Sequence, residues 1–276
     1  MRLLRLFLPI LLVLLPVACQ SSRTRGGGDP SPAPMRLQRI LDSGELRVGL
    51  SGNQPPLNMI NKNGEIVGLE VDLIETLAQS MGLTTRFVVK PFFDLIPAIE
   101  RGEVDVVISG MTITPERNAR VAFVGPYFIS GKSVLTKSEA IASAESAALL
   151  NNADHRYAVL AGSTSETFVE RVLPKAKSVP TKDYDTAVQM VLDDEVEAMI
   201  ADFPICQLSV LRHPEANLST LMTPFTIEPL GIALPADDPL LVNLFENYLN
   251  TLENTGLLLQ FKAKWFSDGS WISELP

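Results

Sequence analysis

The sequence predicts an α/β fold made of two α/β units. Strand-like and helix-like segments alternate from about residue 37 onward, which favours mainly parallel sheets with helices on both faces. The alternation restarts after Ile129, which indicates a second, smaller unit. The chain has 276 residues and is 46% hydrophobic, enough to build two modest cores.

The first unit begins with a helical pattern from Leu37 to Leu41, and Gly44 ends it. The alternating run 46–50 predicts the first strand, and Asn61-Lys62-Asn63-Gly64 between two short apolar runs predicts a hairpin. The remaining segments expected here are a helix at 71–81, a strand at 87–89, a helix at 95–101 and a strand at 104–108.

The second unit is expected to contain three strand–helix pairs. They lie at 157–160 and 165–173, at 177–179 and 186–192, and at 198–201 and about 204–211. The last segment, 240–266, has helical periodicity that Gly256 interrupts.

The stretch Ser109–Asn118 predicts an anion site. A buried strand ends there in small hydroxyl residues, and a turn and Arg117 follow. The planar guanidinium of Arg117 can bind both oxygens of a carboxylate, while Thr112 and the turn N–H groups add neutral donors. The alternative is that Thr114-Pro115-Glu116 only caps a helix and that Arg117 is a surface charge. Capping alone does not explain Ser109 and Thr112.

This stretch resembles the signature of bacterial extracytoplasmic solute-binding proteins of the polar amino-acid type, solute-binding family 3. Gly68-Leu69-Glu70-Val71-Asp72-Leu73 is similar to another motif of that family, with Leu69 in place of an aromatic residue. Further motifs follow in the family's order from about residue 37 to 268: Leu95-Ile96-Pro97-Ala98-Ile99, Gly102-Glu103-Val104-Asp105, Gly162-Ser163-Thr164-Ser165, Val196–Asp202, Leu230-Gly231-Ile232-Ala233 and Lys264-Trp265-Phe266.

The resemblance implies a two-lobed periplasmic-binding-protein fold of type II. Lobe 1 would comprise 36–129 and 230–276, and lobe 2 would comprise 130–229. The chain would cross between the lobes near 129–135 and 225–231, which makes a hinge with the ligand in the cleft. Ligands of open α/β sheets bind beyond the carboxyl ends of strands, where the matched motifs lie.

For an α-amino acid, the resemblance implies that Arg117 binds the carboxylate with help from Thr112 and Thr164. Asp202 would accept the α-ammonium, together with the carbonyl of Gly110 or the hydroxyl of Ser109. Both charges of a buried zwitterion need partners. Asp202 could instead cap the helix that begins at Phe203-Pro204. The ligand-binding residues expected are Arg117, Asp202, Thr112, Ser109, Gly110, Thr164, Ser163, Phe92 and Gln54.

The expected side-chain pocket departs from the family's pattern. Gln54-Pro55-Pro56-Leu57 stands where the family has a Tyr-x-Pro-Phe motif, so one aromatic wall is missing. Phe92 aligns with the opposite wall, although Phe93 could take its place. Relatives that bind basic side chains often carry an acid where this chain has Ser51-Gly52-Asn53. We therefore expect a neutral or polar amino acid bound with help from Asn53 and Gln54, while a ligand that is not an amino acid stays open.

An enzyme is the main alternative. Some proteins of this fold resemble dehydratases of the cyclohexadienyl or prephenate type, which need a protonated acid near position 202. An aspartate that faces an ammonium group is instead kept ionised by the positive charge. The two histidines, His155 and His213, are too few for metal ligation, and no motif predicts a cofactor. A ligand-sensing signalling partner is a third possibility.

The N-terminus resembles a lipoprotein signal. Arg2 and Arg5 precede the apolar run 6–17, which is short for a membrane span, and Ala18-Cys19 ends it. We expect a signal peptide at 1–18, a lipidated Cys19 and a flexible tether at 19–35, although Pro16 departs from the usual lipoprotein motif. Cys206 is expected to be a small apolar residue on a helix.

The expected function is therefore that of an extracytoplasmic binding protein, in the periplasm or at the cell surface, and not of an enzyme. By resemblance it would be a monomer that closes on an amino acid and delivers it to the inner-membrane permease of an ABC-type importer. The formal net charge of -9 argues against nucleic acid as a partner.

Overall fold

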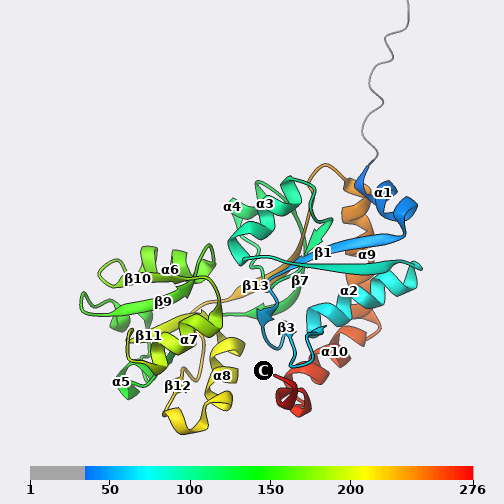
Figure 1. Ribbon diagram of the computed structural model, residues 1–276. Coiled ribbons are helices and arrows are strands. Elements are labelled where there is room, and N and C mark those ends of the chain that lie inside the picture. Colours follow the sequence, from blue (N-terminus) through cyan, green and yellow to red (C-terminus); the bar gives the residue numbers. More distant parts are fainter. Residues whose placement is uncertain (1–34, 276) are drawn as a thin grey trace, which may run out of the picture. The chain divides into compact units, whose positions relative to one another are not determined.

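The computed structural model describes residues 35–275 (Figure 1). The predicted signal peptide, Cys19 and the tether up to residue 34 lie outside the described residues. The described chain is a two-lobed α/β protein in which each lobe has a five-stranded sheet. Among residues 35–275, no helix is long and apolar enough to cross a membrane.

The sheet of the first lobe has the strand order β5-β1-β6-β13-β7. Its strands are β1 Glu45–Leu50, β5 Thr84–Val89, β6 Val106–Val107, β7 Ala122–Ser130 and β13 Glu228–Leu234. A small sheet, β2 Asn53–Gln54, β3 Asn58–Ile60 and β4 Ile66–Val67, belongs to the same lobe. The helices are α1 Arg36–Ser43, α2 Leu69–Ser80, α3 Leu95–Glu100, α4 Pro115–Asn118, α9 Pro239–Asn254 and α10 Leu257–Phe266, with the 3-10 turns η1 Phe92–Asp94 and η4 Ser270–Glu274. Of the C-terminal helices, α9 contacts α1 and α10 contacts α2 (Figure 1).

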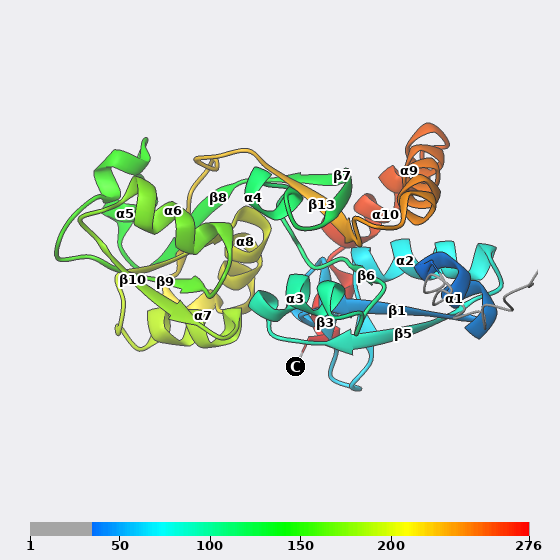
Figure 2. The same cartoon turned by 90° about the horizontal axis from the view of Figure 1, so that it is seen from above.

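The sheet of the second lobe has the strand order β10-β9-β11-β8-β12. Its strands are β8 Lys132–Thr136, β9 Arg156–Leu160, β10 Lys177–Thr181, β11 Ala198–Asp202 and β12 Ser219–Thr220. The helices are α5 Glu139–Ala142, α6 Thr164–Val172, α7 Tyr184–Leu192 and α8 Phe203–Arg212, with the 3-10 turns η2 Ala147–Leu150 and η3 Pro214–Ala216 (Figure 2).

The helix ends follow the sequence signals. Gly44 ends α1 in the left-handed conformation, and Gly256, at φ 75°, separates α9 from α10. The hairpin predicted at 61–64 joins β3 and β4. The strand predicted at 104–108 is shorter, since β6 contains only Val106–Val107.

One strand of each five-stranded sheet runs against the others. β13 is antiparallel to β6 and β7, and β8 is antiparallel to β11 and β12. Each of these two strands is the first after the chain crosses between the lobes. The chain enters the second lobe with β8, which follows β7 through Gly131, and it returns to the first lobe with β13, which follows β12. An antiparallel strand begins where its neighbour ends, so Lys132 lies opposite Asp202 and Glu228 lies opposite Ser130.

The two lobes contact each other through an apolar cluster. Buried residues of the first lobe, such as Leu95 and Met111, pack in one cluster with Met199 and Ile205 of the second. Separate clusters fill the rest of each lobe. The carboxyl ends of β6, β9 and β11, which carry the predicted ligand contacts, are thereby held near this contact.

Candidate functional site

Arg117 lies at the contact between the lobes. Its backbone N–H donates to the side chain of Thr114 (3.3 Å), the residue that caps α4, so the predicted capping occurs. The guanidinium donates to the carbonyl of Thr112 (2.9 Å) and, across the cleft, to the carbonyl of Gly162 (3.1 Å). It also lies 5.4 Å from the centre of the Phe92 ring. Burial lowers the pKa of Arg117 from its ordinary value, although Asp202 and Glu228 oppose the change.

Two threonine hydroxyl groups meet across the cleft. Thr112 follows β6, Thr164 begins α6, and their Oγ1 atoms are 3.3 Å apart. Ser163 caps α6 by accepting from the N–H groups of Ser165 (3.2 Å) and Glu166 (3.4 Å). The structure therefore brings Thr112 and Thr164 together near Arg117, while the Ser163 hydroxyl serves the helix end.

Asp202 ends β11 and is 6% exposed. Its Oδ1 accepts a hydrogen bond from Nζ of Lys132 (2.6 Å), and Lys132 is 1% exposed. The same Nζ is 3.8 Å from Oε2 of Glu228. The side chain of Asp202 makes no capping hydrogen bond to α8, so the capping alternative gains no support.

Sequence reasoning missed Lys132 and Glu228 as members of the site. Lys132 is a single charge at the start of a buried strand in the first predicted crossing, and Glu228 begins the strand of the second crossing. The signal in the sequence that could have identified both residues is a charged residue within a segment that is otherwise apolar and expected to be buried. Tyr184, the first residue of α7, was also missed. Burial first, and then Asp202, raise the pKa of its hydroxyl well above the ordinary value.

Ser109 and Gln54 are buried in a hydrogen-bond network of the first lobe. The Ser109 hydroxyl accepts from the N–H of Ser51 (3.0 Å) and lies 3.2 Å from Oε1 of Gln54. These polar atoms therefore already have partners within the protein. Their roles as ligand contacts stay predictions.

Glu70 anchors this network through hydrogen bonds from Asn58 and Gly110. It accepts hydrogen bonds from the N–H of Gly110 (2.6 Å), from Nδ2 of Asn58 (2.6 Å) and from the hydroxyl of Tyr127. Glu70 is fully buried, and burial raises the pKa of its carboxyl. The acid of the Gly68–Leu73 motif thus fixes Gly110 and the first loop. Gly110 itself has φ 56°, which favours glycine.

Phe92 and Phe93 differ sharply in exposure. Phe92 is 5% exposed beneath Arg117, whereas Phe93 is 57% exposed. Both line a cavity of about 320 Å³ together with Arg117 and Gly162. Leu57 stands where the family has its first-loop aromatic residue, and it packs in the core of the first lobe.

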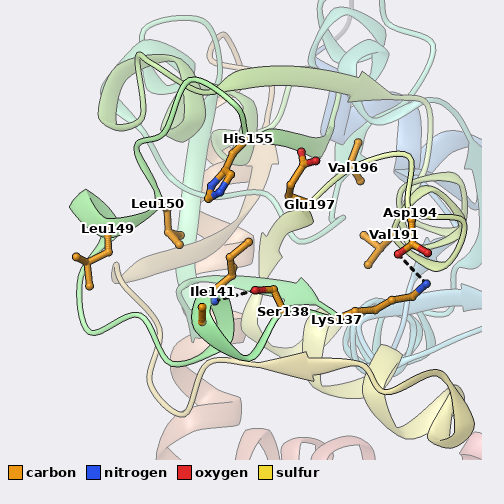
Figure 3. A pocket seen from close by; sticks show the side chains of 11 residues that line it. Lys137, Ser138, Ile141, Leu149, Leu150, His155, Val191, Asp194, Val196 and Glu197 are labelled. Atoms are coloured by element: carbon orange, nitrogen blue, oxygen red, sulfur yellow. Dashed lines mark hydrogen bonds and ion pairs between the residues drawn. The ribbon is translucent and has the colours of Figure 1, made fainter.

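A hollow of about 500 Å³ lies elsewhere, in the second lobe (Figure 3). Its charged groups pair locally: Lys137 with Asp194 (2.9 Å), and Glu197 with Arg156 (3.5 Å). Within residues 35–275 no cluster of three or more His, Cys, Asp or Glu side chains is placed to hold a metal ion. Cys206, on α8, is a buried free thiol.

Comparisons with known proteins agree with this architecture. A model of the family described as bacterial extracellular solute-binding proteins, family 3, matches residues 46–268. The chain is 28% identical over 230 residues to a cyclohexadienyl dehydratase of Pseudomonas aeruginosa, covering 83% of this chain and 85% of that protein. It is 26% identical over 225 residues to ABC transporter arginine-binding protein 1 of Escherichia coli, covering 80% and 90%. The crystal structure of the ancestral amino acid-binding protein AncCDT-1, a precursor of cyclohexadienyl dehydratase, is similar with a TM-score of 0.76 and 34% identity, covering 84% of this chain and 99% of that one.

Proposed function

The chain belongs to family 3 of the bacterial extracellular solute-binding proteins, and from this premise we propose that it captures an amino acid by closure of its two lobes and delivers it to an ABC-type importer. The protein acts outside the cytoplasm, as its family does. In this proposal it is a monomer without catalytic activity of its own, and a lipidated Cys19 holds it to a membrane.

One observation carries the proposal: a half-buried cation of the first lobe and a buried carboxylate of the second lobe lie close enough for their charges to interact. Arg117 comes from the first lobe, and Asp202 comes from the second. The ligand carboxylate binds Arg117 with the hydroxyls of Thr112 and Thr164, and the α-ammonium binds Asp202. Only closed lobes bring both sets of partners to the ligand, so binding and closure are coupled.

A neutral or polar ligand side chain fits the first lobe best. The first loop carries Asn53 and Gln54 and no acid. Oδ1 of Asn53 is buried and has no hydrogen-bond partner among the described residues. Glu70, the nearby acid, is enclosed by its own three donors. A basic side chain would therefore lack a carboxylate partner in this loop.

The test is calorimetric titration of the protein with the common amino acids, after unfolding and refolding to release any ligand that it carries. We expect one or a few neutral amino acids to bind. Binding should be lost in both Arg117→Ala and Asp202→Ala, since each truncation leaves a buried charge unpaired. Unchanged affinity in either variant would contradict the assignment of Arg117 to the ligand carboxylate and of Asp202 to the ligand ammonium.

The contact between Lys132 and Asp202 also supports a second candidate. Because the chain itself supplies an ammonium group to Asp202, a carboxylic acid without an amino group could bind to Arg117 alone. The dehydratase relative belongs with this candidate. Binding or turnover of prephenate, with no response to any amino acid, would favour it over the amino-acid proposal.

A further inference from the structure

Three charged side chains meet where both crossings enter their lobes, and the charge of a fourth, Arg117, interacts with the two carboxylates among them. Lys132 and Glu228 begin the crossing strands β8 and β13, Asp202 ends β11, and Arg117 lies in α4. With each group in its ordinary charge state, the positive charges of Arg117 and Lys132 balance the negative charges of Asp202 and Glu228. The four side chains together therefore carry no net charge.

The charges are not distributed evenly. Lys132 lies within 4 Å of both carboxylates, with Nζ 2.6 Å from Asp202 and 3.8 Å from Glu228. This group of three carries a net charge of minus one, and Arg117 carries plus one. An amino acid with an uncharged side chain matches this division, since its ammonium neutralises the group of three and its carboxylate neutralises Arg117.

The position of Lys132 is fixed by its backbone. Its N–H donates to Oγ1 of Thr226 (2.9 Å), and its carbonyl accepts from the N–H of Phe225 (2.8 Å). Thr226 in turn donates to Oε1 of Glu228 (3.0 Å). Both crossing segments thus fix the backbone of Lys132, and its side chain, which is 1% exposed, is held by the hydrogen bond to Asp202 and does not extend into solvent as that of a surface lysine does.

Other charges near the cavity are solvated. Glu116 and Arg120 line it, but both are exposed and pair on the surface, with Arg171 (3.6 Å) and Glu100 (2.7 Å). Exposed pairs are screened by water and salt and contribute little to the selection of a ligand. The buried lysine and its two carboxylates act in a lower dielectric, where one unit of charge has a large effect.

We propose that Lys132 is the specificity-determining residue for ligand charge, an internal cation that restricts this site to amino acids with uncharged side chains. The inference rests on the proposed function and extends it to a substrate class. Without Lys132 the site would hold two carboxylates against one arginine, and it would favour a ligand with a net charge of plus one. Without Glu228 it would favour a ligand with a net charge of minus one.

The experiment measures affinities for arginine, glutamine and glutamate as the cationic, neutral and anionic probes. In Lys132→Met we expect the affinity ratio of arginine to glutamine to rise by about tenfold or more, the effect of one full charge a few ångströms away at an intermediate dielectric constant. In Glu228→Gln we expect the ratio of glutamate to glutamine to rise by a similar factor. The two variants must shift selectivity in opposite directions.

Lys137→Met is the matched control. It removes the same charge just after β8, where Nζ of Lys137 contacts Asp194 (2.9 Å) and the carbonyl of Leu192 (2.6 Å), outside the cleft. Its ratios should equal those of the wild type. Ratios in Lys132→Met that stay within twofold of the wild type would overturn the proposal.

The two proposals fail in different ways. If the wild type binds no amino acid, the proposed function fails. In that case a gain of arginine binding in Lys132→Met still supports the role of Lys132 in charge selection. No arginine binding in Lys132→Met would then overturn that role as well. If Lys132→Met does not fold, the Glu228→Gln arm decides. In that case a glutamate-to-glutamine ratio equal to that of the wild type overturns the proposal.

Discussion

The contact between the lobes leaves no room for a side chain at position 162, and Gly162→Ala tests what this contact contributes to binding. Gly162 follows β9 in the second lobe at φ 72°. An added Cβ would lie 2.8 Å from Cβ and 3.2 Å from Cα of Phe93, in the first lobe. The obstacle is therefore the backbone and first side-chain atom of Phe93, and a rotation of the Phe93 ring cannot remove it.

The expected magnitude follows from two separate effects. The left-handed conformation costs an alanine about 1–2 kcal/mol whether or not ligand is bound. Non-bonded carbon atoms prefer a separation of about 3.5–4.0 Å, so the lobes must part locally by roughly 0.7 Å or more. The same movement stretches the 3.1 Å hydrogen bond from Arg117 to Gly162 beyond bonding range. Loss of a hydrogen bond from a charged donor costs about 1.5–3 kcal/mol, a tenfold to hundredfold loss of affinity.

The assay is calorimetric titration with the amino acid that the wild type binds, beside denaturant unfolding without ligand. Gly82→Ala is the control, because Gly82 has φ 68° and no atom lies within 4 Å of an added Cβ. Both variants should lose similar stability, but only Gly162→Ala should lose affinity. Adding Phe93→Gly to Gly162→Ala removes the nearest atom and should restore part of the binding. Wild-type affinity in Gly162→Ala, or an equal loss in Gly82→Ala, would refute the reasoning.

Three further predictions concern the site and its support. Arg117→Ala and Asp202→Ala should each weaken amino-acid binding by about 2–5 kcal/mol in calorimetry, because each leaves an opposite charge unpaired in the cleft. Glu116→Gln removes the exposed pair between Glu116 and Arg171 (3.6 Å), which joins the lobes, and should change affinity less than about threefold at low salt and not at all at high salt. Burial raises the folded-state pKa of Glu70 above its ordinary 4.5, so the stability that its protonated form contributes is present below pH 4.5 and is lost as the pH rises through the raised pKa. Urea unfolding over this pH range should show a decline in the free energy of unfolding in the wild type and not in Glu70→Gln. Parallel pH profiles of the two proteins would contradict this prediction.

Most elements of the fold could be predicted because their signals are local. The periodicity of 240–266 and its break at Gly256 define α9 and α10, and the signal Asn61-Lys62-Asn63-Gly64 defines the hairpin of β3 and β4. The capping sequence before Arg117 also indicated α4 correctly. Each of these signals depends on residues within a few positions of one another, so one sequence is enough to read them.

The partners of the site residues could not be predicted in the same way. The sequence predicts a ligand ammonium beside Asp202, and it gives no sign of the hydrogen bond from Lys132, which joins residues 70 positions apart. Glu70 belongs to a motif that the sequence shows plainly, yet its contact with Gly110 joins residues 40 positions apart. No periodicity or turn signal carries such pairings, because they depend on the order of strands in the sheets.

The strand order explains why Lys132 and Glu228 lie near the carboxyl end of β11. A strand that enters from the other lobe has no preceding crossover helix in its new lobe, and here both entering strands run antiparallel to their neighbours. Their first residues therefore lie at the edge where the parallel strands end, which is the edge that binds ligands. Lys132 and Glu228 occupy these first positions. A charge at the first residue of a crossing strand thus lies at the edge where we propose that the ligand binds, so charge changes there should alter ligand selection more than charge changes farther along the same strands.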